Sequence, residues 1–409
     1  GSECLPYLNT SALCNNGAAE KTGDAFQVNT HTTGGQDNPA SAGLINGDAI
    51  VAWTSYSQGG VYGQRLDSQG TAIGDEFKIN TNGNTNTLDV EVAALSDGFV
   101  VVWASDHGSQ FDIYGQRFDN QSNPVGVEFL INTEVSNAQR YPSVAELNDG
   151  GFVVVWHSAH NTIGDGVFSQ QYDSSGDKVG DEVQVNYEIV NGKHHRNAKV
   201  AAFSHGGYVV AWQRATSPTW QNDIMLQSFD STGTKVGDEV QVNTFVDYGQ
   251  TGIRIGVFSD DSFIAVYSSQ RLYPSQQGLQ LYAQHFDASG NKAGDEFALN
   301  ENPTGQVYYK DILVLSGDKF ILTWTEEGNR DGNSMGIFAN LYDSTGTALL
   351  NEFQVNDYYL SSQWQGVIAK LGDGFLIAWM GKSATDTDGI SAQRFEMSGG
   401  NARAVLGQA

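Results

Sequence analysis

The chain has 409 residues, of which 39% are hydrophobic and 17% charged, with 48 glycines against 7 prolines. Its 21 Lys and Arg residues against 47 Asp and Glu residues give a formal net charge of −26. This balance argues against a nucleic-acid partner, because such a partner needs a basic binding surface. No apolar run approaches the roughly 20 residues needed to cross a membrane.

The chain opens with a short polar segment, residues 1–17, that carries both of its cysteines, Cys4 and Cys14. Two free thiols are one interpretation. We favour a disulfide that pins this tail, and therefore a secreted protein in an oxidising extracellular or periplasmic compartment.

From residue 18 onward, one heptapeptide recurs seven times with a spacing near 50 residues. The copies are GDAFQVN at 23–29, GDEFKIN at 74–80, GVEFLIN at 126–132, GDEVQVN at 180–186 and again at 237–243, GDEFALN at 294–300, and LNEFQVN at 350–356. Such a period indicates repeated supersecondary units. Because the repeat is unbroken, we expect one domain over 18–409.

Each later copy ends a longer unit, clearest in unit 3 at residues 141–186. A first strand at 143–147 meets a tight turn, NDGG, and a fully apolar second strand at 152–156. A third strand at 168–172 leads through an Asx-type turn, DSSG, to the heptapeptide as fourth strand. The aromatic residue that ends each second strand also occurs seven times: Trp53, Trp103, Trp156, Trp212, Tyr267, Trp324 and Trp379.

The first heptapeptide precedes every other strand, whereas the seventh unit has no copy of its own. A closed ring explains this offset, with residues 24–29 supplying the outermost strand of unit 7. An open array would leave an unpaired edge. We therefore predict an all-β, seven-bladed β-propeller of four-stranded antiparallel blades, closed by the N-terminal strand. The length of the loops varies at one end of the ring, which we call the long-loop face and expect to carry function.

The motifs GGFVVVW, YGQRFD and the heptapeptide resemble the propeller-type repeats of secreted bacterial surface proteins and of polysaccharide-degrading enzymes from marine bacteria. The resemblance covers some 380 residues. It implies a seven-bladed propeller, and the polysaccharide lyases that share this architecture, such as ulvan lyases, use a His/Tyr/Arg site.

Two departures from the internal repeat mark units 3 and 4. The crossover into most units carries Gln (Gln36, Gln139, Gln250 and Gln363), but unit 4 has His195, and Thr87 and Val307 also differ. Directly after the strand-ending aromatic, unit 3 has His157, and unit 4 has Gln213 followed by Arg214. The predicted catalytic residues are His157, His195, Arg214 and Tyr187. The predicted substrate-binding residues are His160, His194, Arg196, Arg140, Tyr248, Arg271 and Trp220.

These residue types suit β-elimination from a uronic acid, which needs a base, a cation to neutralise the carboxylate and an acid for the leaving oxygen. We therefore expect an enzyme that degrades an acidic, uronate-containing or sulfated polysaccharide, and that acts as a monomer. Glycoside hydrolysis by paired carboxylates is the alternative, with Glu326, Glu327, Asp331, Asp106 and Asp165 as candidates. A non-catalytic carbohydrate-binding or adhesin propeller is the third.

No cofactor is required by this chemistry. Zinc on His157, His160, His194 and His195 lacks a tight ligand motif. The loop at 329–333 offers oxygen ligands that suit a structural calcium ion.

Overall fold

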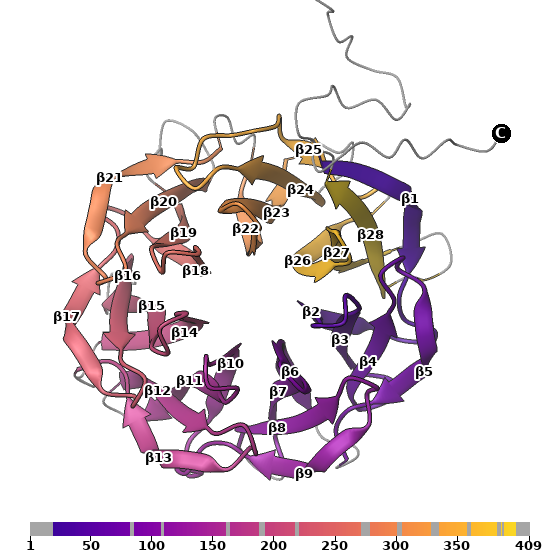
Figure 1. Cartoon of the computed structure of the whole chain (residues 1–409), viewed down its shortest axis with the longest axis horizontal. Coiled ribbons are helices and arrows are strands. Elements are labelled where there is room, and N and C mark those ends of the chain that lie inside the picture. The colour runs from indigo at the N-terminus through magenta and orange to yellow at the C-terminus, as the bar shows by residue number, and fades with distance from the viewer. Residues whose placement is uncertain are drawn as a thin grey trace, which may run out of the picture.

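The computed structural model of the chain describes residues 19–81, 86–107, 110–160, 164–187, 193–216, 221–270, 279–300, 305–328, 335–357, 361–382, 386 and 388–397. The predicted tail with Cys4 and Cys14 lies outside these residues. All regular elements of the described residues are β-strands, arranged as a ring of sheets around a common centre (Figure 1). No helix in the described part of the chain has the length and apolarity that a membrane crossing requires.

Each unit begins with the strand nearest the centre of the ring. These strands are β2 (Gln36–Gly43), β6 (Thr87–Leu95), β10 (Gln139–Glu146), β14 (Lys193–Ala202), β18 (Gln250–Val257), β22 (Val307–Leu315) and β26 (Gln363–Leu371). The second strands are almost entirely buried. They are β3 (Ala49–Ser55), β7 (Gly98–Ser105), β11 (Phe152–His160), β15 (Tyr208–Thr216), β19 (Phe263–Ser269), β23 (Lys319–Glu327) and β27 (Gly374–Gly381).

The third and outermost strands complete each unit. The third strands are β4 (Gly60–Leu66), β8 (Asp112–Asp119), β12 (Gly164–Tyr172), β16 (Gln221–Phe229), β20 (Gln280–Phe286), β24 (Met335–Tyr342) and β28 (Gly389–Met397). The outermost strands are β5 (Ala72–Lys78), β9 (Pro124–Leu130), β13 (Lys178–Gln184), β17 (Lys235–Gln241), β21 (Lys292–Ala298), β25 (Phe353–Gln354) and β1 (Ala19–Gln27).

The units are numbered from β2–β5 (unit 1) to β26–β28 with β1 (unit 7). Among the described residues the strands form five four-stranded sheets and one eight-stranded sheet. The eight-stranded sheet joins units 3 and 4, because β12 and β14 pair in parallel at Gly164–Lys193 and Asp165–His194. The sequence had not predicted this joint.

The N-terminal strand completes unit 7, as predicted. β1 pairs antiparallel with β28, so indigo and yellow strands share one sheet in Figure 1. The heptapeptide asparagine explains the register. Asn186 Oδ1 accepts a hydrogen bond from Val167 N (2.8 Å) within unit 3, and Asn29 Oδ1 accepts one from Ile390 N (2.7 Å) across the closure. The same side chain therefore fastens the outermost strand to the third strand in both places.

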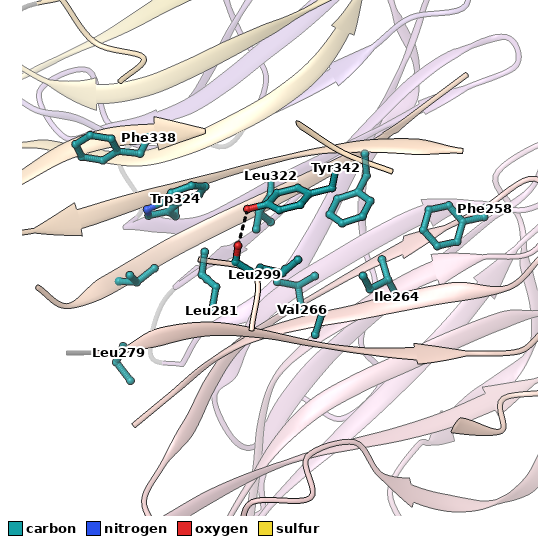
Figure 2. Packing of buried hydrophobic residues seen from close by; sticks show 13 residues of the cluster. Phe258, Ile264, Val266, Leu279, Leu281, Leu299, Leu322, Trp324, Phe338 and Tyr342 are labelled. Carbon is teal, nitrogen blue, oxygen red and sulfur yellow. Dashed lines mark hydrogen bonds between the residues drawn. The ribbon is translucent and has the colours of Figure 1, made fainter. Parts of the chain in front are cut away.

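The core lies between neighbouring units. In the cluster between units 5 and 6, Val266 and Leu281 pack against Leu322 and Trp324, and the Tyr342 hydroxyl donates to Leu299 O at 3.2 Å (Figure 2). Because each second strand is apolar on both faces, it can pack against both neighbours. This packing between units fixes the innermost strands in their places around the centre of the ring.

The outer rim carries a second repeated contact. The heptapeptide glutamate accepts a hydrogen bond from the backbone N–H that follows the previous unit's heptapeptide, as in Thr30 N to Glu76 Oε2 (2.8 Å) and Thr133 N to Glu182 Oε2 (2.8 Å). Unit 7 has Ala25 at the glutamate position, and there Lys21 Nζ pairs with Asp357 Oδ1 at 2.5 Å.

Candidate functional site

Each innermost strand has a β-bulge at its start, and these bulges together form the mouth at the centre of the long-loop face. The pairing of each innermost strand with its second strand shifts register there. The residue in each shift has a left-handed backbone: Asn38 (φ 52°), Asp89 (55°), Tyr141 (52°), Asn197 (53°), Gly252 (65°), Tyr309 (33°) and Gln365 (51°). A bulge redirects a side chain and is common beside functional sites. These seven residues, the bulge ring, lie at the long-loop face because each innermost strand begins there.

The bulge ring surrounds a cavity of about 540 Å³ that is lined from all seven innermost strands. Its lining includes four cations, Arg140, Lys199, Arg254 and Lys310, and three acids, Asp89, Glu91 and Asp311. The described lining therefore carries a formal excess of one positive charge inside a chain of net charge −26. A concave site of this charge favours an anionic ligand.

In unit 3, an arginine, a tyrosine and a histidine meet at this mouth. Arg140 and His157 are opposite each other in the β10–β11 pairing. The Arg140 guanidinium lies 5.0 Å from the centre of the Tyr141 ring, and the centre of the His157 ring lies 5.1 Å from it. Tyr141 is 43% exposed and lines the cavity together with Arg140, so a ligand can touch both of them, whereas His157 is not part of the lining. Its left-handed backbone costs on the order of 1–3 kcal/mol, a strain typical of functional positions.

Arg140 is fixed by an ion pair, but some of its hydrogen-bond donors remain unused. Its Nε donates to Asp89 Oδ2 at 2.7 Å, and its guanidinium also lies over the Phe111 ring at 4.7 Å. Within the described residues its terminal Nη groups make no hydrogen bond. Arg140 is the one predicted site residue, among those described, that lines the cavity.

His157 lies behind Tyr141. It is 7% exposed, and its Nδ1 has no hydrogen-bond partner among the described residues. Burial is the main cause that lowers the pKa of His157 to about 4; Asp165 opposes this shift, and Arg196 and Arg140 add to it. The imidazole is therefore neutral near pH 7 and can accept a proton.

His195 takes over a structural task of the repeat. Trp212 Nε1 donates to His195 Nδ1 at 2.8 Å, as Trp156 Nε1 donates to Gln139 (3.1 Å) and Trp379 Nε1 to Gln363 (2.8 Å). His195 is 3% exposed, and burial next to Arg214 lowers its pKa to about 4. The replacement of Gln by His thus has a packing explanation.

Of the remaining predicted residues, His194 and Arg196 lie at the joint between units 3 and 4, whereas Arg214 is bound within unit 4. Asp165 binds both His194 Nδ1 (3.2 Å) and Arg196 Nε, at the parallel pairing of β12 with β14. Arg214 Nη2 donates to Asp223 Oδ2 and Gln241 Oε1, both at 3.1 Å. The structure brings these predicted residues together, but beside the cavity and not in its wall.

Tyr187 lies on the outer rim, away from this group. Its backbone N–H donates to Glu239, the contact that Thr133 makes one unit earlier, and its hydroxyl donates to Gly237 O at 3.1 Å. Its ring is 4.5 Å from Lys235 Nζ. Tyr187 is therefore not brought together with His157 or His195, because it follows an outermost strand.

The other predicted residues are less informative. Tyr248 lies in the crossover into unit 5, where its ring stacks with Phe245 at 6.5 Å. His160 ends β11, and only its backbone is described. Arg271, Trp220 and the loop 329–333 lie outside the described residues.

The candidate acids for hydrolysis are tied to the scaffold where they are described. Glu326 is 2% exposed and accepts from Trp324 Nε1 at 3.3 Å, so it serves as the indole acceptor in unit 6, where Val307 stands in the place of Gln. Asp106 accepts from Asn86 N and Nδ2, both at 2.8 Å. Glu327 is exposed and accepts from the Tyr308 hydroxyl at 3.3 Å. Asp331 lies outside the described residues. No group of three His, Cys, Asp or Glu side chains in the described residues could hold a metal ion.

Sequence reasoning missed Lys310. Its counterparts, one residue after the bulge residue in the other units, are apolar or small: Pro39, Val90, Pro142, Ala198, Ile253 and Gly366. Lys310 is 3% exposed, and its Nζ donates to Gly252 O at 2.9 Å and Thr251 O at 3.4 Å. Burial, and then Arg254, lower its pKa to about 7. A comparison of the units at this position would have found it.

No protein family matches the chain, and no curated protein matches its sequence. Solved structures match its fold. A Dyadobacter fermentans protein of unknown function is 10% identical with a TM-score of 0.55, covering 78% of this chain and 97% of that one. The polysaccharide lyase Uly1 is 11% identical with a TM-score of 0.53, covering 97% of this chain and 94% of that one. The alpha-L-arabinofuranosidase Arb93A of Fusarium graminearum is 11% identical with a TM-score of 0.51, covering 91% and 98%. The resemblance to polysaccharide-degrading propellers holds at the level of architecture.

Proposed function

We propose that the chain is a seven-bladed propeller enzyme that cleaves an acidic polysaccharide by β-elimination at the cavity mouth of unit 3. The observation that carries this proposal is the placement of Tyr141, exposed at the cavity between the Arg140 guanidinium (5.0 Å) and the His157 ring (5.1 Å). A phenol, an imidazole and a guanidinium are the groups that elimination next to a uronate requires. The positive excess of the cavity lining supports an anionic substrate.

In this proposal each side chain has a defined role. The free Nη groups of Arg140 bind the uronate carboxylate and stabilise the charge that develops as the adjacent C–H proton leaves. The Tyr141 oxygen, whose own proton passes to His157 behind it, takes that C–H proton and gives it to the departing glycosidic oxygen, so the C–O bond breaks as the C=C bond forms, and His157 then returns its proton to Tyr141. A bound carboxylate opposes the positive field of Arg140 and Arg196, which raises the pKa of His157 toward the range useful for a base.

The residues of the joint have a supporting role in this scheme. His194 and Arg196 join unit 4 to Asp165 of unit 3, while His195 and Arg214 hold the strands of unit 4. Since the substrate is an extracellular polymer, the proposal includes secretion, and it treats residues 18–409 as one monomeric domain.

The test is the ultraviolet absorbance of the unsaturated uronate product. Wild-type protein is incubated with a panel of uronate-containing and sulfated algal polysaccharides, and Tyr141→Phe and His157→Gln are compared with it. Both variants should melt like the wild type while the rate falls by roughly 10²-fold or more. Full activity in Tyr141→Phe would contradict the proposed site.

Glycoside hydrolysis is the second candidate, and Asp311 is the observation that favours it. Asp311 lines the cavity, and burial raises its pKa, as a general acid requires. Saturated reducing ends without the absorbance would indicate hydrolysis. Sugar binding without cleavage would indicate a binding module.

A further inference from the structure

The bulge ring has one position without a side chain. Six of its residues are Asn, Asp, Gln or Tyr, and the seventh is Gly252 of unit 5. A Cβ at residue 252 would lie 2.5 Å from Lys310 Nζ, so the amine occupies the space that a side chain at this position would take. Gly252 and Lys310 are therefore adapted to each other: the missing side chain leaves a gap in the ring, and a buried amine fills it in the wall of the cavity.

Lys310 is also the cation without an acid partner. The other three cations of the cavity lining each pair with an acid: Arg140 with Asp89, Lys199 with Glu91, and Arg254 with Asp311. Lys310 contacts only backbone carbonyl oxygens among the described residues. A buried amine without a counterion is held close to its neutral form near pH 7, and a bound anion would favour the charged form, so the wall offers a place for a negative charge that the described residues do not supply.

Arg254 contributes a second donor at the same place. It lies two residues after Gly252 on β18 and lowers the pKa of Lys310, so the two cations are close enough to interact. Its Nε donates to Asp311 Oδ1 at 3.3 Å and its Nη1 to Ile253 O at 3.0 Å. Its Nη2 makes no hydrogen bond within the described residues.

We propose that the cavity wall at Gly252 is a subsite for one oxyanion group, held by Lys310 Nζ and Arg254 Nη2. The group is a carboxylate or a sulfate ester of the ligand, since both present oxygens to an ammonium and a guanidinium. The subsite belongs to units 5 and 6, in a different part of the cavity wall from Arg140 and Tyr141 of unit 3. Resting on the proposed function, it implies a polymer with an anionic group on a sugar other than the one that reacts.

The experiment is calorimetric titration of sodium sulfate and of sodium glucuronate, at constant ionic strength, into four proteins. They are the wild type, Lys310→Met, Gly252→Asn and the control Lys319→Met, whose lysine lies in the same unit at the opposite end of the ring. Gly252→Asn keeps Lys310 but fills the gap with the residue that units 1 and 4 carry at φ values near 52°. Melting curves establish that each variant is folded.

The wild type and Lys319→Met should bind at least one of the two anions equally well, and Lys310→Met and Gly252→Asn should bind it about tenfold more weakly or worse. Binding of sulfate alone identifies a sulfate ester, and binding of glucuronate alone identifies a carboxylate. Equal binding by the wild type and Lys310→Met, or no binding by the wild type, would overturn the subsite.

This outcome is separable from that of the proposed function. Anion binding that depends on Lys310, without any polysaccharide cleavage, leaves the subsite intact and removes the elimination proposal. Cleavage that yields the unsaturated product, together with unchanged anion binding in Lys310→Met, supports the elimination proposal and removes the subsite.

Discussion

Trp212 donates its indole N–H to His195 Nδ1 at 2.8 Å, and this bond decides which nitrogen of His195 carries the proton. Because Nδ1 accepts, the neutral ring is protonated on Nε2, which is buried without a partner in the described residues. Protonating Nδ1 would break the bond to Trp212 and bury a charge next to Arg214.

We therefore expect His195→Gln to fold normally, because Gln139 and Gln363 accept the same bond from their tryptophans. The melting temperature at pH 7.5 should stay within a few degrees of the wild type. His195→Leu, which leaves the indole N–H unpaired, should cost about 1–3 kcal/mol. A similar loss in both variants would contradict the assigned acceptor role.

The two buried histidines should make the protein acid-sensitive. The pKa values of His157 and His195 are lowered to about 4 in the folded protein from 6.5, so the unfolded chain binds protons first as the pH falls. Their contribution to stability is complete above pH 6.5 and is lost as the pH falls toward 4. Urea midpoints at pH 7.5 and 5 should therefore differ less for the double variant His157→Gln/His195→Gln than for the wild type. His31→Gln, at a partly exposed histidine outside units 3 and 4, is the matched control.

Lys310→Met should stabilise the protein near neutral pH. The pKa of Lys310 is lowered to about 7 from 10.5, so the folded state disfavours its charge, and this cost grows as the pH falls from 10.5 toward 7. Removing the amine should raise the unfolding free energy by about 1–3 kcal/mol at pH 7. The gain should be smaller at pH 10, as measured by urea unfolding. A gain that does not change with pH would show that packing and not charge is responsible.

Ring closure predicts matched costs for two asparagines. Asn29→Ala removes the acceptor for Ile390 N, and Asn186→Ala removes the acceptor for Val167 N. Each leaves a buried N–H unpaired, and each should lower the unfolding free energy by about 1–3 kcal/mol. If Asn186→Ala alone destabilises the protein, β1 does not close the ring in solution.

At the boundary between units 6 and 7, the glutamate-to-backbone hydrogen bond found elsewhere on the outer rim can be introduced by substitution. The double variant Ala25→Glu/Asp357→Thr restores the glutamate and threonine that meet at Thr30–Glu76. It removes the exposed Lys21–Asp357 ion pair, and such pairs contribute about 0–1 kcal/mol. We expect a net gain of roughly 1 kcal/mol in thermal or urea unfolding, the usual size of one added hydrogen bond. Ala25→Glu alone should gain less, because it places two acids side by side.

Much of the architecture could be predicted because the units repeat the residues that hold it together. The heptapeptide asparagine and the offset of the first copy together predict the pairing of β1 with β28. The Asx turns were also predicted: Asp173 Oδ1 accepts from Ser175 N and Asp177 N, both at 2.9 Å. The parallel pairing of β12 with β14 has no such repeated signal.

The site was harder to predict, for two physical reasons. The bulge residues share a left-handed backbone conformation but not a side chain. Tyrosine rarely adopts this conformation, so the sequence does not reveal it at Tyr141 and Tyr309. A departure such as His195 also does not reveal whether the new side chain performs the old task, and here it does. Arg140 lies in the cavity wall, whereas Lys310 could be found only by comparing the units at a position that had not been aligned.

The bulge ring separates what holds this protein together from what a ligand touches. The asparagine and glutamate contacts lie in the outer strands, so a substitution at Asn38, Asn197 or Gln365 leaves them intact. Such a mouth can be diversified one unit at a time without refolding the scaffold. The left-handed backbone limits the choice, because glycine, asparagine and aspartate adopt it most readily. Evolution toward a new sugar would then proceed by small polar exchanges, with an aromatic residue kept only where its contact with the ligand outweighs its strain.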